Sequence, residues 1–123
     1  DGFKEVNDTL GHEAGDRVLE LVAERLIKCV REEDTVARLG GDEFTVILTG
    51  AQQQKDIELV AQSIIDAIAV PFSLVQMPVQ ISASIGISTF TDTTISSIAM
   101  LEAADHAMYK AKKSGSNRIY FHE

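Results

Sequence analysis

The sequence TVARLGGDEFTVIL at residues 35–48 predicts a β-hairpin. Two short runs of β-forming residues, 35–38 and 44–48, flank a pair of adjacent glycines, which supply the positive φ that a tight connection requires. Two adjacent carboxylates, Asp42 and Glu43, follow the glycines, although the turn itself does not need them. Carboxylates beside a backbone without side chains can hold a hard cation while a phosphate group approaches. A solvated acidic turn is the alternative, and the hairpin taken alone favours it.

Hydrophobic periodicity predicts three helices and two further strands around this hairpin. Apolar residues recur at three- and four-residue spacing over about 14–32, 53–69 and 96–113, as in amphipathic helices. Residues 81–88 alternate between apolar and small side chains, as in a strand, and 118–121 form a last strand. This order of elements fits an α+β fold in which helices pack on an antiparallel sheet in the ferredoxin-like manner.

Composition indicates one globular domain, since the chain has 123 residues and 45% hydrophobic content. Its 11 basic and 19 acidic residues give a net charge of −8, which argues against a nucleic-acid partner. Any anionic nucleotide would therefore have to be bound by local positive charge and a metal ion, because the overall charge of the chain repels it. The single cysteine, Cys29, cannot form an internal disulfide and fits a reducing compartment. No apolar run reaches the length of a membrane span, so no direct membrane contact is expected.

Three blocks of sequence carry a family resemblance: DGFKEVNDTLGHEAGD at 1–16, GGDEF at 40–44 and AADHAMYKAK at 103–112. In this order and at these spacings, the chain resembles GGDEF domains, which are diguanylate cyclases that condense two GTP molecules into cyclic di-GMP. The resemblance covers essentially the whole chain and implies the nucleotide-cyclase, or palm-type, form of the sheet. GGDEF domains have one more central strand upstream. We therefore expect a single domain over 1–123 that is N-terminally truncated and lacks its first strand.

The resemblance also implies the residues that handle metal and phosphate. Asp42 and Glu43 would hold Mg²⁺ (or Mn²⁺) and act in catalysis, together with a strand aspartate that should lie two residues before Asp1 and is absent here. Asp1 is a weak substitute for that aspartate. Lys4 would stabilise the charge that develops on the phosphates, since phosphoryl transfer demands charge neutralisation; a solvated lysine is the alternative.

The expected substrate contacts come from all three blocks. Guanine recognition needs acceptors for its N–H groups, and Asn7 and Asp16 resemble the family's base-reading pair. Turn and helix-cap roles are the alternative for both residues. The family often has an arginine where this chain has Ser116, although Arg118 follows two residues later. The full set of expected substrate-binding residues is Asn7, His12, Asp16, Lys112, Gly40 and Gly41.

The segment Arg31-Glu32-Glu33-Asp34 reproduces the family's Arg-x-x-Asp inhibitory site, nine residues ahead of Gly40. Arginine can pair with a phosphate or lie along a guanine while aspartate accepts from the base edge. This resemblance implies that the product, cyclic di-GMP, also binds as an inhibitor, with Arg38 contributing to the site. A salt bridge at a helix end is the alternative.

Three functional hypotheses follow. The first is a cytoplasmic diguanylate cyclase in a parent protein that can be membrane-anchored, active as a homodimer and controlled by sensory domains; the truncation leaves open whether this fragment turns over GTP alone. The second is a non-catalytic module that binds GTP or cyclic di-GMP beside an EAL phosphodiesterase domain. The third, a remote RNA-binding domain of the RRM type, shares the sheet order but lacks basic and aromatic strand signatures.

Overall fold

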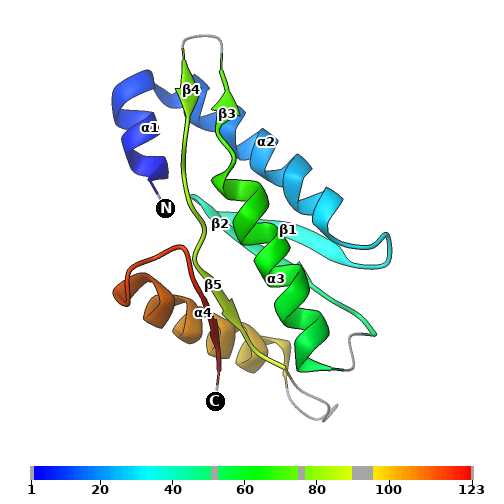
Figure 1. Cartoon of the computed structure of the whole chain (residues 1–123). Helices are drawn as coiled ribbons and strands as arrows, with labels where there is room; N and C mark the ends of the chain where they lie inside the picture. Colours follow the sequence, from blue (N-terminus) through cyan, green and yellow to red (C-terminus); the bar gives the residue numbers. More distant parts are fainter. Residues whose placement is uncertain (1, 51–52, 75–76, 90–95, 123) are drawn as a thin grey trace. The chain divides into compact units, whose positions relative to one another are not determined.

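The structure is a computed structural model that describes residues 2–50, 53–74, 77–89 and 96–122. These residues contain four helices and six strands (Figure 1). They divide into two compact units, Gly2–Ile81 and Ser82–Glu123. The first unit holds the hairpin and three helices, and the second holds one helix and two strands.

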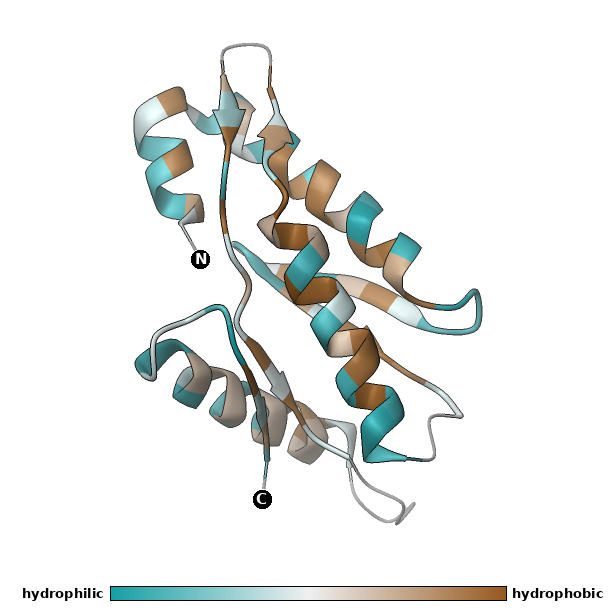
Figure 2. Cartoon of the chain, viewed as in Figure 1, coloured by the Kyte–Doolittle hydropathy of each residue, from teal (hydrophilic) through white to brown (hydrophobic). Residues whose placement is uncertain are grey.

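Three helices of the first unit pack through apolar faces: α1 (Phe3–Leu10), α2 (His12–Cys29) and α3 (Gln54–Ala69). Gly11 separates α1 from α2 and has a φ of 93°, a backbone angle that residues other than glycine rarely adopt. Figure 2 shows that α2 and α3 alternate between polar and apolar residues along their length. The buried residues recur at three- and four-residue spacing, as one face of a helix requires; they are Val18, Leu19, Val22 and Leu26 on α2 and Ala61, Ile64, Ile65 and Ile68 on α3.

The first unit also contains two antiparallel strand pairs. Strands β1 (Thr35–Gly40) and β2 (Glu43–Ile47) form the predicted hairpin, with Val36 opposite Val46. The register shifts between Arg38 and Gly40, so that Leu39 is an extra residue on the β1 side. Strands β3 (Phe72–Ser73) and β4 (Pro78–Val79) form a second, shorter pair.

Arg25 ties α2 to the end of α3. Its Nη1 donates to the carbonyl oxygens of Ala67 and Val70 at 2.7 and 2.6 Å, and its Nη2 donates to Pro71 at 3.1 Å. The guanidinium carbon also lies 3.5 Å from the centre of the buried Phe72 ring. The last carbonyls of a helix have no partner within the helix, and a cation there is favourable. Arg25 therefore caps α3 from a different helix.

The second unit consists of β5 (Ile85–Ile87), α4 (Ser97–Lys113) and β6 (Ile119–Phe121). Strands β5 and β6 pair in parallel, because α4 connects them and returns the chain to the same end. The Ser96 side chain caps α4 by accepting from the Ala99 N–H at 3.1 Å. A Cβ placed on Gly86 would overlap the backbone of Ala104 and Met108, so only glycine lets α4 approach β5 this closely.

The α+β class and the three predicted helices are confirmed. The described strands form three two-stranded pairs, one of them parallel, in place of a wholly antiparallel sheet. Of the strand predicted at 81–88, only Ile85–Ile87 pairs with another described strand. No helix was predicted before residue 14, but α1 occupies Phe3–Leu10 and α2 begins at His12, so Asn7 and Asp16 lie on two successive helices.

Candidate active site

The hairpin tip presents two carboxylates beside bare backbone. Gly41 has a φ of 53°, and a Cβ placed on Gly40 or Gly41 would meet no atom within 4 Å. Asp42 and Glu43 are exposed, and neither has an ion-pair or hydrogen-bond partner for its side chain among the described residues. A phosphate group can therefore approach the glycine backbone while both carboxylates stay free to bind a cation.

This donor set fits a hard divalent cation that arrives with phosphate. Within the described ranges, no three His, Cys, Asp or Glu side chains form a group that could hold a metal ion by themselves. Magnesium does not need such a cage, because it commonly binds one or two carboxylates, substrate phosphates and water. Asp42 and Glu43 supply such a pair; Asp1 lies outside the described residues.

Arg38 closes the hairpin tip. Its Nε donates to the Gly41 carbonyl oxygen at 2.8 Å, across the turn from β1. The structure therefore places this guanidinium beside the catalytic candidates, and it is not among the residues that line the cavity at Arg31 and Asp34. The tip is held by the chain itself in the conformation that exposes Asp42.

The base-reading candidates lie where α1 meets α2. Lys4 and Asn7 are on α1, and His12 and Asp16 are in the first two turns of α2. Lys4, His12 and Asp16 are exposed, and Asn7 is half-buried. The Gly11 N–H donates to the Asn7 carbonyl oxygen at 2.9 Å, and the Gly15 N–H donates to Gly11 at 3.2 Å. These bonds fix the corner between the two helices and bring Asn7 against α2.

The remaining phosphate candidate belongs to the second unit. Lys112 is exposed in the last turn of α4. Beyond the helix, Ser116 and Asn117 have φ values of 60° and 52°. The Arg118 guanidinium lies against Gly115, since a Cβ there would be 3.1 Å from its Nη2. Arg118 therefore stands beside the end of the helix that carries Lys112.

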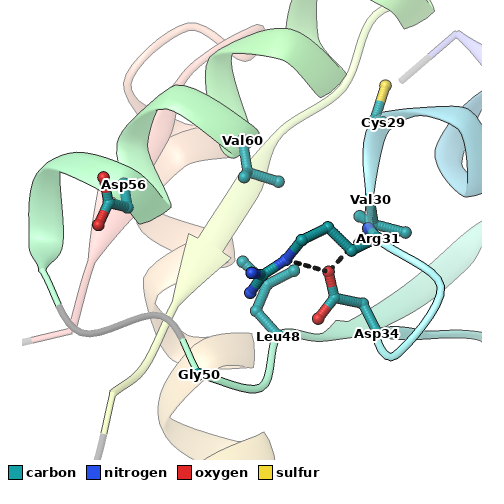
Figure 3. A pocket seen from close by; sticks show the side chains of 8 residues that line it. All are labelled: Cys29, Val30, Arg31, Asp34, Leu48, Gly50, Asp56 and Val60. Atoms are coloured by element: carbon teal, nitrogen blue, oxygen red, sulfur yellow. Dashed lines mark hydrogen bonds and ion pairs between the residues drawn. The ribbon is translucent and has the colours of Figure 1, made fainter.

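A cavity of about 190 Å³ lies at the corner between α2, β2 and α3. Figure 3 shows Asp34 facing the Arg31 side chain, with Val60 of α3 above and Leu48 below. The Arg31 Nη2 donates to the Thr49 carbonyl oxygen at 2.8 Å, and its Nε lies 3.2 Å from Glu33 Oε1 and 3.8 Å from Asp34 Oδ2. Arg31 is 60% exposed and its Nη1 has no partner among the described residues. Its guanidinium can therefore take an anionic ligand.

Asp34 is held differently, by backbone donors. Its Oδ2 accepts from the Arg31 N–H at 2.9 Å and its Oδ1 accepts from the Thr49 N–H at 3.1 Å. The side chain is only 3% exposed. These two bonds, and then the Arg31 charge, hold the pKa of the Asp34 carboxyl below its usual range. Asp34 thus joins Arg31, just after α2, to Thr49, two residues past the end of β2, a structural role that the sequence did not predict.

Acid is expected to remove this contribution to stability. Because the folded-state pKa of Asp34 is lowered, its stabilisation is present above the ordinary carboxyl pKa of about 3.9 and is lost as the pH falls through the folded value. Asp34→Asn should unfold at lower urea concentration than the unmodified chain at pH 7, and the difference should shrink below about pH 3.9. The control is Glu32→Gln, an exposed neighbour without a described partner. A pH-independent difference would contradict this role.

Cys29 also lines the cavity, with its Sγ 3.9 Å from the Ser63 carbonyl oxygen. Partial burial raises the pKa of the thiol. A raised pKa lowers the thiolate fraction, so Cys29 is a poor nucleophile.

Comparison with known proteins identifies a family. A sequence model described as diguanylate cyclase, GGDEF domain, matches residues 1–118. Two curated proteins of Pseudomonas aeruginosa are similar along the chain. The bifunctional diguanylate cyclase/cyclic di-GMP phosphodiesterase MucR is 44% identical over 123 residues, which are 100% of this chain and 18% of MucR. Diguanylate cyclase TpbB is 43% identical over 122 residues, 97% of this chain and 28% of TpbB. The chain therefore spans less than a third of either relative.

Solved structures agree with the sequence comparison. The GGDEF domain of TpbB has a TM-score of 0.92 at 40% identity, with 100% of this chain and 77% of that one covered. The GGDEF domain of DgcB from Caulobacter crescentus, solved in complex with c-di-GMP, has a TM-score of 0.88 at 27% identity, with 98% and 72% covered. No helix among the described residues is long and apolar enough to cross a membrane.

Proposed function

This chain is a member of the GGDEF family of diguanylate cyclase domains, and we propose that the protein that carries it condenses two molecules of GTP into one of cyclic di-GMP and two of pyrophosphate. The observation that carries the proposal is the pair of free carboxylates, Asp42 and Glu43, beside the bare backbone of the Gly40-Gly41 turn. One family model covers residues of both compact units, which supports a single functional domain over 1–123.

Each reaction step transfers a nucleotidyl group. The 3′-hydroxyl of one GTP attacks the α-phosphorus of the other, a bond forms from O3′ to phosphorus, and pyrophosphate leaves with the electrons of the broken P–O bond. Diguanylate cyclases use a divalent metal ion, and Mg²⁺ or Mn²⁺ bound at Asp42 and Glu43 would neutralise phosphate charge and polarise the phosphoryl oxygens. Lys4 and Lys112 would contribute further positive charge.

Substrate selection would fall to the corner of α1 and α2. Asn7 offers both a donor and an acceptor, Asp16 offers acceptors for the N–H groups of guanine, and His12 is near them in sequence on α2. Each domain would hold one GTP, so two copies must face each other to close the ring. We therefore expect turnover by a homodimer, in the cytoplasm where GTP is abundant.

The test is product formation by the full-length protein with Mg²⁺ and GTP. Chromatography with mass detection should find cyclic di-GMP and pyrophosphate, and EDTA should stop their formation while added Mg²⁺ or Mn²⁺ restores it. Failure to form cyclic di-GMP despite tight GTP binding would favour a non-catalytic regulatory module. That second candidate is supported by the similarity to cyclic di-GMP phosphodiesterase NbdA of Pseudomonas aeruginosa, 33% identical over 121 residues, whose name gives phosphodiesterase activity and no cyclase activity.

Feedback by product is expected at the cavity of Arg31. The free Nη1 of Arg31 can donate to a phosphate, and its exposed plane can stack on a base. In Arg31→Ala, the cyclic di-GMP concentration that gives half-maximal inhibition should rise about tenfold or more. The loss of a charged hydrogen bond of about 1.5–3 kcal/mol predicts this change. Initial velocity at low product should stay near that of the unmodified protein.

The control for this prediction is Glu32→Ala in the same segment, because Glu32 is exposed and has no described partner. Inhibition curves with added cyclic di-GMP measure both variants. If cyclic di-GMP inhibits Arg31→Ala and the unmodified protein equally, Arg31 does not bind the product and only forms a salt bridge at a helix end.

A further inference from the structure

Gly15 of α2 is buried directly beneath the Asn7 side chain of α1. A Cβ placed on Gly15 would overlap the Asn7 Oδ1 and would lie 2.8 Å from the Asn7 Cγ. It would also lie 3.3 Å from Cζ of Phe3, one turn earlier on α1. The amide therefore occupies the space that any other residue at position 15 would fill.

The backbone does not explain a glycine at this position. Gly15 is inside a helix and is absent from the described glycines with positive φ. Alanine is the better helix former, because glycine loses more backbone freedom when it is fixed in a helix. Close approach of the Asn7 amide is the remaining physical reason for glycine here.

Packing against Gly15 positions the Asn7 amide, because its side-chain oxygen and nitrogen make no hydrogen bond within the described residues. The residue is half-buried. Its backbone is fixed, since its carbonyl oxygen accepts from Gly11 at 2.9 Å. The hollow above Gly15 thus sets where the amide group points. An amide reads a base through one donor and one acceptor, so its direction decides what it can pair with.

We propose that Gly15 is a positioning residue for nucleotide recognition, which acts through Asn7 and holds its amide in the direction that guanine requires. The inference rests on the proposed function, since it assigns Asn7 to the base. Gly15 also directly precedes Asp16, the second base-reading candidate. The helical turn that contacts the Asn7 amide through Gly15 therefore also carries the Asp16 carboxylate.

Gly15→Ala separates binding from stability. Because the overlapped atoms end a short, rotatable side chain, the Asn7 amide can swing away, and alanine then favours the helix. The melting temperature of the full-length protein should be unchanged or a few degrees higher. The Kd for GTP in calorimetric titration should rise about tenfold, and the KM should rise likewise with kcat nearly unchanged. Glu13→Ala, in the same part of α2 without a described partner, is the matched control.

A double-mutant cycle tests whether Gly15 acts through Asn7. Asn7→Ala should weaken GTP binding by itself. Adding Gly15→Ala to that variant should cost no further affinity, because the atoms that it displaces are gone. Additive losses, or GTP affinity unchanged in Gly15→Ala, would overturn the positioning role. If the unmodified protein binds no GTP, both the proposed function and the positioning role of Gly15 are refuted. GTP binding with no effect of Gly15→Ala defeats this inference alone.

Discussion

We expect Asp42→Ala to lower the rate of cyclic di-GMP formation by about 100- to 1,000-fold, the range that losing one charge-stabilising group costs an enzyme. Asp42 is exposed at the hairpin tip and has no described partner, so its carboxylate is available to a cation and its loss should leave the fold intact. Chromatography of nucleotides measures the rate, and thermal unfolding should give the melting temperature of the unmodified protein.

The matched control is Glu24→Ala, which removes an exposed acid without a described partner from α2. It gives the same change in net charge on a helix outside the hairpin, and its rate should stay near that of the unmodified protein. Full activity of Asp42→Ala would sink the assignment of the metal site, and equal losses in both variants would point to net charge.

The second large effect is expected on nucleotide choice. The carboxylate of Asp16 can accept from the N–H groups of guanine, and adenine leaves it unpaired at about 1–3 kcal/mol per lost bond. The unmodified protein should therefore bind GTP roughly 10- to 100-fold more tightly than ATP. Asp16→Asn replaces an acceptor with a donor and should remove most of this preference.

Calorimetric titration with GTP and ATP measures both variants. Glu13→Gln, three residues earlier on α2 and also exposed, is the control for lost charge and should keep the preference. Equal affinity of the unmodified protein for the two nucleotides would refute the base-reading role of Asn7 and Asp16.

Local patterns predicted the long elements correctly. Helices α2, α3 and α4 have enough turns for their apolar spacing to stand out, and the β1–β2 hairpin has its own turn signal. Helix α1 was missed because it has only eight residues and ends at Gly11. The spacing of Phe3, Val6 and Leu10 is the signal that would have revealed it. Strands β3 and β4 have two residues each, too few for any period.

The site was predictable as a set of residue types but not as a set of contacts. The hairpin carboxylates were identified through the resemblance to GGDEF domains, because the hairpin taken alone favours a solvated acidic turn. Arg25 was missed because its partners lie 42 to 46 residues away, and no local pattern encodes that pairing. Asp34 was interpreted as a ligand residue, and only the structure reveals that both its oxygens accept from backbone N–H groups. Arg38 is predicted at the inhibitory site by resemblance, and only the structure reveals that its guanidinium donates to the Gly41 carbonyl oxygen.

The bond from Arg38 to Gly41 has a consequence for transplanting this motif. The direction of Asp42 depends on that bond and on the extra residue Leu39. Both Arg38 and Leu39 precede the five signature residues, 40–44. The smallest transferable unit is therefore the seven-residue segment from Arg38 to Phe44. A graft of residues 40–44 alone into another hairpin would keep the signature sequence but would not fix the conformation of the loop. Cation binding would then have to order the loop, and this entropy cost would lower the affinity for the cation.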